Sequence, residues 1–433
     1  MTRFKTFLVG LVAVGAFFLG GWLLRKGLTP VAPAPAPVAS VGGTRLFNSV
    51  LQTVRAYAVD SLDESGVYRL AASGVLGELG DPYAGLVSDR DTAAARGRIG
   101  PAPVQGLYLD LADGFVAAVS VVPGSPAAAA GIRSGDAILR VGETNIRSQS
   151  ADEVAALIDG RPGTTVSLRL GREGSTSALG PQLTRGSVPA FPDATLQTLE
   201  DGTTHLRAYR IDRAAIAALE EALRAGGPGR PGLVIDLRGA VEGTLGDAVT
   251  FATRLLDRGQ SVVIVRRRPA DDSTAAAGDA ETRHVDTPVV VLVDRGTAGA
   301  AEVVAGALQD HDRAVIVGET TFGRAGRASF FPLGGGLSLR LTTELWVTPS
   351  GRVIQRTSPL QQSDASVDTV EVRPEFRTGG GRVVLGGGGV VPDREITSTG
   401  EVSTQADPAM AVARQLLARA PDRKSLIAAL TSN

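Results

Sequence analysis

The chain contains no cysteine and only three histidines, which limits the thiol, imidazole and metal chemistry that it could perform. Its 433 residues include no Cys, which excludes a thiol nucleophile, a disulfide and any metal site that needs cysteine. The three histidines, His205, His284 and His311, are not spaced to share a metal ion on one helix face. We therefore expect no metal and no cofactor.

The basic residues are almost all arginines. The 44 Lys and Arg residues divide into 41 Arg and three Lys, namely Lys5, Lys26 and Lys424. A guanidinium group stays protonated at physiological pH, so only a lysine amine could be tuned to accept a proton. The formal net charge of −1 gives no global positive field, so we expect no nucleic-acid partner.

The start of the chain has the pattern of a membrane segment. Phe7 to Leu24 is an unbroken run of apolar residues and glycines, at the lower length limit for a spanning helix. The basic pair Arg25 and Lys26 favours an uncleaved signal anchor, whereas the small residues that follow leave a cleaved signal peptide open. We expect this segment in residues 1–28, with an extended Ala/Pro linker over 29–43.

Three folded regions are expected after the linker. Helical spacing of apolar residues predicts a helical region over 44–100. Short β-type runs around one helix, Ser150 to Asp159, predict a small α+β module over 101–175. Alternating helices and strands predict a crossover α/β core over 185–421, before a short tail at 422–433. The expected fold class is therefore α/β (α+β) and multidomain.

The core region should contain one sheet covered by helices. Its expected strands are Leu233 to Leu237, Ser261 to Val265, Val289 to Val293 and Ala314 to Val317. Its expected helices are Ile211 to Arg224, Gly246 to Leu256 and Ala300 to Gln309. The polar stretches Asp271 to Glu281 and Thr357 to Val372 are expected to be surface loops.

The module at 106–170 resembles a PDZ domain. The resemblance rests on the stretch VVPGSPAAAAGIRSGDAILRVGETNI, residues 121–146. It implies that Gly106, Leu107, Tyr108 and Leu109 hold the terminal carboxylate of a peptide through backbone amides, and that the adjoining strand edge accepts an extended peptide. The alternative is that Gly106 only forms a turn and that Leu107 and Leu109 are core residues.

The regions on either side of this module resemble the C-terminal processing (tail-specific) serine peptidase family. The matching motifs are LGDPYAGLV at 79–87, GLVIDLR at 232–238, the stretch from PVVVLVDRGTAGAAE to ETTFGRAG at 288–326, LSLRLTTELWVTPSGRVIQ at 337–355 and GRVVLGGGGVVPD at 381–393. The family order of helical region, PDZ domain and core is also kept. The resemblance implies a serine-type peptidase fold.

The same resemblance implies that the catalytic site is degenerate. The family's nucleophilic serine is matched by Gly299 and its general-base lysine by Arg324, and neither residue can perform that role. The glutamine that orients the lysine in many members is Ala328 here. In the oxyanion loop, residues 236–243, a glycine is replaced by Glu242, whose carboxylate would oppose a developing oxyanion.

No other residue is expected to restore catalysis. Thr297 lies two positions before Gly299, so its side chain should point away from the nucleophile position and serve as a cap or turn hydroxyl. His311 is expected at the surface near a helix C-terminus, and Asp310 is expected to have a structural role.

We therefore interpret the chain as an exported, membrane-tethered pseudopeptidase that binds peptide or unfolded-protein C-termini. Its expected location is the cell envelope, anchored in the inner membrane with the folded part periplasmic or extracellular. The alternatives are an active serine-type endopeptidase of the C-terminal processing family with a displaced nucleophile, and a structural partner of an active paralogue. A homo- or hetero-oligomer is compatible with each interpretation.

Overall fold

The computed structural model describes residues 40–58, 64–81, 83–88, 103–112, 115–146, 149–172, 175, 177–190, 192–225, 232–268, 271–278, 286–356, 373–396 and 407–431. The apolar run Phe7 to Leu24 and the expected loop Thr357 to Val372 lie outside these ranges. Within them, no helix is both long enough and apolar enough to span a membrane. The chain divides into two compact units, residues 1–72 and 73–433, and each is described by itself.

The described residues of the first unit are helical, as predicted, although the helical region expected over 44–100 also contains a strand at Gly85–Ser88. Helix α2 (Ser40–Tyr57) contains no acidic residue and carries Arg45 and Arg55. Helix α3 (Glu64–Glu78) begins in this unit and continues into the second. Of the apolar residues of α2, Leu51 is buried, whereas five others are exposed: Leu46, Phe47, Val50, Val54 and Tyr57.

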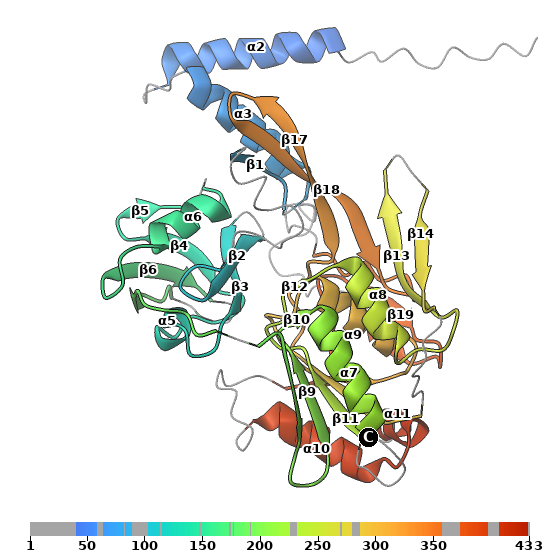
Figure 1. Cartoon of the computed structure of the whole chain (residues 1–433). Helices are drawn as coiled ribbons and strands as arrows, with labels where there is room; N and C mark the ends of the chain where they lie inside the picture. The colour runs from blue at the N-terminus through green and yellow to red at the C-terminus, as the bar shows by residue number, and fades with distance from the viewer. Residues whose placement is uncertain are drawn as a thin grey trace, which may run out of the picture. The chain divides into compact units, whose positions relative to one another are not determined.

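The PDZ module contains the predicted strands and helix (Figure 1). Its sheet has the order β2-β3-β4-β6-β7, with β5 beside β4. The elements are β2 (Leu107–Ala112), β3 (Phe115–Val121), α5 (Pro126–Ala129), β4 (Ala137–Val141), β5 (Thr144–Asn145), α6 (Ala151–Ile158), β6 (Thr165–Gly171) and β7 (Gln182–Thr184). Helix α6 begins at Ser150 because Ser150 and Glu153 form a reciprocal capping box. Strand β7 lies beyond the predicted domain boundary at residue 175.

The core is built on a six-stranded sheet of order β21-β16-β15-β11-β9-β8. Its strands are β8 (Ala194–Thr198), β9 (Thr204–Ala208), β11 (Leu233–Asp236), β15 (Val289–Val293), β16 (Val315–Gly318) and β21 (Arg394–Glu395). All neighbouring pairs are parallel except β8 with β9. The central strands are buried along their whole length because both faces of the sheet are covered.

Alternate residues of each strand pack on different helices. Ile235 and Val291 belong to the cluster that includes α7 (Arg213–Ala225), α8 (Leu245–Thr253) and α9 (Ala300–Asp310). Their neighbours Val234 and Val290 pack instead with α10 (Pro408–Arg419), which precedes α11 (Arg423–Thr431). Because side chains alternate between the two faces of a strand, this division gives three layers. The helices of the two outer layers can be followed in Figure 1.

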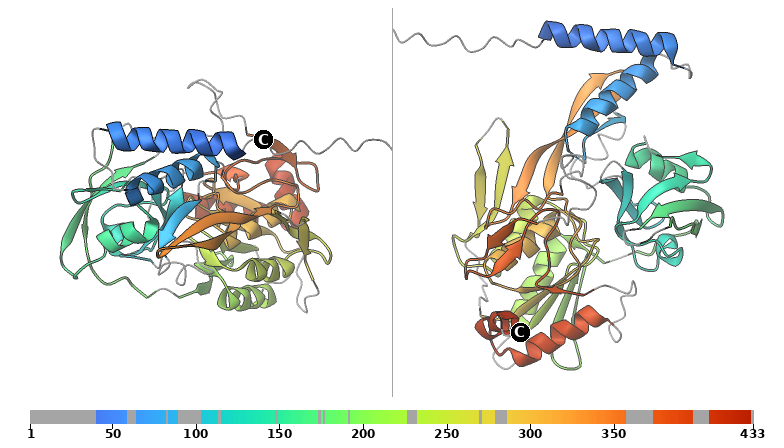
Figure 2. Two further views of the ribbon diagram at one scale, coloured as in Figure 1. Left: turned by 90° about the horizontal axis from the view of Figure 1, so that it is seen from above. Right: turned by 180° about the vertical axis from the view of Figure 1, so that it is seen from behind.

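A second, antiparallel sheet corrects two expectations. Its order is β1-β18-β13-β14, with β17 beside β18, from β1 (Gly85–Ser88), β13 (Ser261–Arg267), β14 (Ser273–Ala276), β17 (Gly326–Gly334) and β18 (Leu337–Val347). Strand β13 was expected in the crossover sheet but pairs with β18. Strand β14 falls inside the expected loop Asp271 to Glu281, since its polar, mostly exposed residues give no hydrophobic signal. Figure 2 shows the long β17–β18 hairpin from two more directions.

Two short strand pairs complete the described core. Strands β10 (Arg210–Ile211) and β12 (Glu242–Gly243) form a short parallel pair. Strands β19 (Glu375–Arg377) and β20 (Val383–Leu385) form an antiparallel pair. The first of these pairs joins the end of the oxyanion loop to the chain that leads into α7.

Candidate functional site

Gly299 lies at a sharp turn between strand β15 and helix α9. It is the N-cap of α9, with backbone angles φ 65° and ψ −121°. An L-residue rarely adopts this conformation, and it is strained where it occurs. A strand, a tight turn and a helix form the arrangement that exposes a nucleophile in many hydrolases, so the backbone of a nucleophile elbow is present without the side chain.

Glu302 joins this elbow to the loop that contains Arg324. Its buried carboxylate accepts hydrogen bonds from the amides of Gly299 (3.0 Å), Gly323 (2.7 Å) and Arg324 (2.8 Å), and from the Thr321 hydroxyl. The Gly299 amide also donates to the Arg324 carbonyl over 2.9 Å. Burial raises the pKa of Glu302 to about 7, although all four donors oppose this change. The structure thus brings positions 299 and 324 together, as the family resemblance implies.

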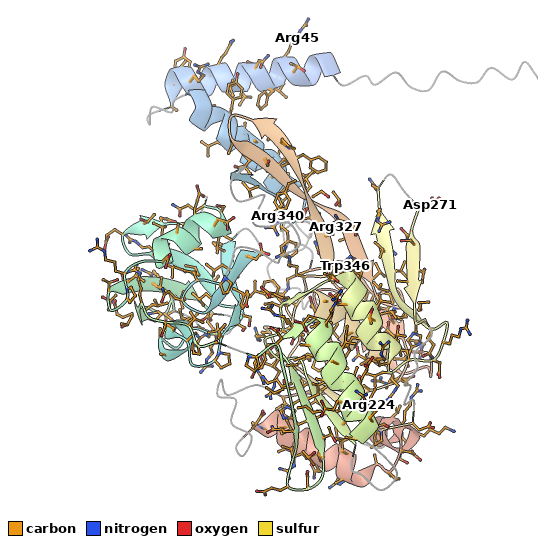
Figure 3. All side chains as sticks on the ribbon, in the orientation of Figure 1. Arg45, Arg224, Asp271, Arg327, Arg340 and Trp346 are labelled. Carbon is orange, nitrogen blue, oxygen red and sulfur yellow. The ribbon has the colours of Figure 1, made fainter. Side chains whose placement is uncertain are left out.

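The Arg324 side chain is buried among aromatic and charged groups. Its guanidinium lies 5.0 Å from the centroid of the Tyr83 ring and ion-pairs with Asp110 of the PDZ domain. Arg340, labelled in Figure 3 and carried by β18, ion-pairs with the same carboxylate at 3.0 Å. Burial lowers the pKa of both arginines from its usual value, which means that the charged forms are costly without a counter-ion. The Tyr83 hydroxyl donates to the Gly323 carbonyl over 3.0 Å.

The Thr297 side chain forms hydrogen bonds at the turn, as predicted. Its buried hydroxyl lies 2.9 Å from the Leu237 carbonyl and 3.1 Å from Asp294 Oδ1, and it accepts the Asp294 amide over 3.0 Å. The neighbouring Ala298 amide donates to the Ala240 carbonyl of the oxyanion loop over 2.9 Å. These bonds hold the elbow against the oxyanion loop.

The other two degenerate positions lie at the edges of this site. The Glu242 carboxylate ion-pairs with Arg210 at 2.8 Å, so its charge is partly neutralised within the β10–β12 pair. Ala328 lies on β17, opposite Thr342 on β18. A nearby glutamine from another segment, Gln355, donates to the Thr342 hydroxyl over 3.3 Å.

The PDZ domain covers the loops that contain positions 239, 298 and 322. Tyr108 and Val119, from β2 and β3, pack with Val241 of the oxyanion loop, Ala298 of the elbow and Phe322 of the Arg324 loop. A hydrogen bond of 2.9 Å from the Ser120 hydroxyl to the Gly239 carbonyl adds to this contact. Sequence reasoning did not find the participation of Tyr83, Asp110 and Arg340. Tyr83 lies within the recognised LGDPYAGLV motif and Arg340 within the recognised motif at 337–355, and these were the signals available.

The four predicted peptide-binding residues occupy a tight loop and the start of β2. Gly106 has φ 88°, and a Cβ atom there would lie 2.2 Å from Ser125 Oγ. Leu107 and Leu109 are fully buried, and the Leu107 amide already donates to the Val104 carbonyl over 2.8 Å. Tyr108 is half-buried in the cluster that covers the degenerate site. This packing agrees with the alternative interpretation, in which Gly106 forms a turn and Leu107 and Leu109 are core residues.

His205, His311 and Asp310 form contacts within the fold. His311 caps the C-terminus of α9 as expected, but it is half-buried and not a surface residue, because its ring bonds the Ser261 carbonyl over 2.7 Å. Asp310 accepts the Ser350 amide over 2.8 Å and ion-pairs with buried Arg352, which confirms its structural role. His205 lies 3.5 Å from Asp236, and His284 is outside the described residues.

Comparison with known proteins identifies the family. Residues 204–361 match the model of peptidase family S41, and residues 118–172 match a PDZ domain. The carboxy-terminal-processing protease of Bartonella bacilliformis is 30% identical over 71% of this chain and 72% of its own length. The carboxy-terminal processing protease CtpA of Bacillus subtilis is 28% identical over 73% and 68%.

A solved structure agrees with this assignment. The photosystem II D1 C-terminal processing protease has a TM-score of 0.60 and 25% identity, over 85% of this chain and 90% of that one. The chain therefore belongs to the carboxy-terminal processing protease family, peptidase family S41, and carries the PDZ domain of that family.

Proposed function

We propose that this chain is a non-catalytic member of its family, a pseudopeptidase that binds peptides or proteins. The observation that carries the proposal is the elbow itself, where Gly299 has the backbone of a nucleophile position and no group that could attack a carbonyl. The residue at the lysine position, Arg324, presents a guanidinium that ion-pairs with Asp110 and cannot serve as a base. Both roles of a Ser-Lys pair are therefore missing.

The ligand class follows from the PDZ domain and from the relatives. The matched relatives are named for processing carboxy-termini, and we propose that this chain binds C-terminal segments of peptides or unfolded proteins. The edge of β2 beside α6 is the expected binding position, because an extended peptide can add to a free strand edge. The Val104–Leu107 hydrogen bonds close the adjoining loop, so binding of a carboxylate there requires the loop to rearrange.

We further propose that the protein is exported and tethered to a membrane by Phe7 to Leu24. The proposal rests on the length of this apolar run and on its basic flanks. The folded part would then lie outside the inner membrane, where extracytoplasmic protein C-termini are available as ligands.

The activity test separates this function from that of an active peptidase with a displaced nucleophile. The full-length chain should hydrolyse neither casein nor peptides with an apolar C-terminal tail, and a serine-reactive fluorophosphonate should not label it. An active family member serves as the positive control. Turnover that Thr297→Ala abolishes would contradict the proposal and identify Thr297 as the nucleophile, although its hydroxyl is now bonded to Leu237 and Asp294.

A further inference from the structure

The cation at position 324 is retained although the catalytic pair is absent, and its contacts suggest a different role. Arg324 and Arg340 are 7% and 6% exposed, and both ion-pair with one carboxylate, Asp110, which is fully buried. Asp110 belongs to β2 of the PDZ domain, whereas the two arginines come from the Arg324 loop and from β18 of the core. The ion pairs therefore cross from one domain to the other.

The PDZ carboxylate is the acidic group that ion-pairs directly with both arginines. Asp81 also acts on the two arginines by its charge, but its oxygens accept hydrogen bonds from the Thr342 amide (2.8 Å), the Thr342 hydroxyl (2.9 Å) and the Tyr83 amide (3.0 Å). If Asp110 moved away, two buried guanidinium groups would lose their shared partner. A buried charge without a partner is strongly destabilising, so the cluster favours the arrangement in which the PDZ domain stays in place.

The same face of the PDZ domain contacts every part of the degenerate site. Asp110 reaches the Arg324 loop, the Ser120 hydroxyl bonds the oxyanion loop at Gly239, and Val119 packs in one cluster with Ala298 of the elbow. The apolar contacts add burial, but they have no charge requirement and do not fix one orientation. The ion pairs fix the orientation of the PDZ domain relative to the core.

We infer that Asp110, Arg324 and Arg340 form an interdomain clasp that holds the PDZ domain closed over the elbow. In this arrangement Asp110 ion-pairs, from within the chain, with Arg324, the residue at the position where the family has its general-base lysine. The clasp does not depend on whether the PDZ domain binds C-termini. The clasp gives the cation at position 324 a structural role in a chain whose residue 299 is a glycine. It also leaves the outer edge of β2 as the position for an extended ligand.

Distance measurements in the full-length protein test the clasp. Because the chain has no Cys, Arg169→Cys on β6 and Glu221→Cys on α7 give two exposed and unique positions for spin labels, one on each domain. Pulsed electron resonance should give one narrow distance distribution with the clasp intact. Asp110→Asn should broaden the distribution and shift it to longer distances, and hydrogen exchange of residues 296–300 and 321–324 should become faster.

Two further variants act as controls. Arg324→Lys keeps the positive charge and should keep the narrow distribution. Asp310→Asn removes a carboxylate from the equally buried Asp310–Arg352 pair inside the core and should not open the domains. If Asp110→Asn does not accumulate as folded protein, Arg324→Gln gives the same comparison. An unchanged distribution and unchanged exchange in the folded charge-removing variant, or equal opening in Asp310→Asn, would overturn the clasp.

Discussion

Glycine at position 299 has no side chain that could act as a nucleophile, and it also avoids a conformational cost. At φ 65° and ψ −121° a side chain on this residue would be strained, and strain of this kind costs about 1–3 kcal/mol. An active enzyme accepts such a cost because the strained residue performs the reaction. A chain without catalysis has no reason to retain it, and the elbow can exist here as a relaxed turn.

Gly299→Ser should therefore destabilise the protein by about 1–3 kcal/mol without restoring activity. Urea unfolding measures the first effect, and a casein assay measures the second. The exposed helical position Gly246→Ala is the matched control and should be neutral or stabilising by about 0.4–1 kcal/mol, because its φ is ordinary and its Cβ would meet no close atom. Family-level turnover in Gly299→Ser combined with Arg324→Lys would contradict the prediction, since Ala328 and Glu242 remain.

Glu302 gives the second prediction at this scale, a dependence of stability on pH. Its folded-state pKa of about 7 lies above the usual value, so the folded protein binds this proton more tightly than the unfolded chain. The resulting contribution to stability is present at low pH and is lost as the pH rises from about 4.5 through about 7. Its full size is at most roughly 3 kcal/mol.

Urea-unfolding free energies at pH 5, 6, 7 and 8 test this dependence. The wild-type protein should lose stability over this range, and Glu302→Gln, less stable overall because its amide cannot accept all four donors, should lose less with rising pH. Glu221→Gln, an exposed carboxylate on α7, should behave as wild type. Parallel pH profiles for wild type and Glu302→Gln would show that Glu302 does not titrate in this range.

At the scale of elements, the hydrogen bonds within the PDZ loop affect how strongly a peptide C-terminus can bind there. The Leu107 amide is bonded to Val104, and Gly106 packs against Ser125, so a terminal carboxylate competes with contacts already made. Peptides with a free apolar C-terminus should bind at roughly micromolar Kd. Amidation removes the charge that the loop would hold and should weaken binding, as fluorescence anisotropy can measure. Equal affinities for free and amidated peptides would show that the loop does not recognise the carboxylate.

Local patterns predicted most elements, because each strand or helix carries its own hydrophobic period. Helix α6, strands β15 and β16 and helix α9 appear where the sequence predicted them. The sheet that a strand joins is not encoded in such a run. Strand β13 has the Val and Ile content of a crossover strand, yet its partner is β18.

The candidate site was predictable only where a motif marks a single position. Gly299 and Arg324 were found because each replaces a residue in a recognisable block. The clasp could not be found in this way, since Asp110 and Arg340 are 230 positions apart and pair only through tertiary folding. A lone aspartate between apolar strand residues carries no signal of its partner.

For the whole molecule, location is the property that remains a prediction. If Phe7 to Leu24 acts as a signal anchor, protease added to spheroplasts should digest the folded part, and an intact mass should include residues 1–24. Survival of the chain until the membrane is permeabilised would place the domain in the cytoplasm instead. A digested chain whose mass lacks the apolar run would indicate a cleaved signal peptide.

Helix α10 has a consequence for the order in which the protein can be completed. Its residues Met410, Ala413 and Leu417 cover one face of the central sheet, and its N-cap Asp407 pairs with Arg238 at 2.6 Å. All strands of that sheet precede α10 along the chain. During synthesis or export the strands emerge first, so this apolar face stays uncovered, and accessible to chaperones or to misassembly, until α10 emerges.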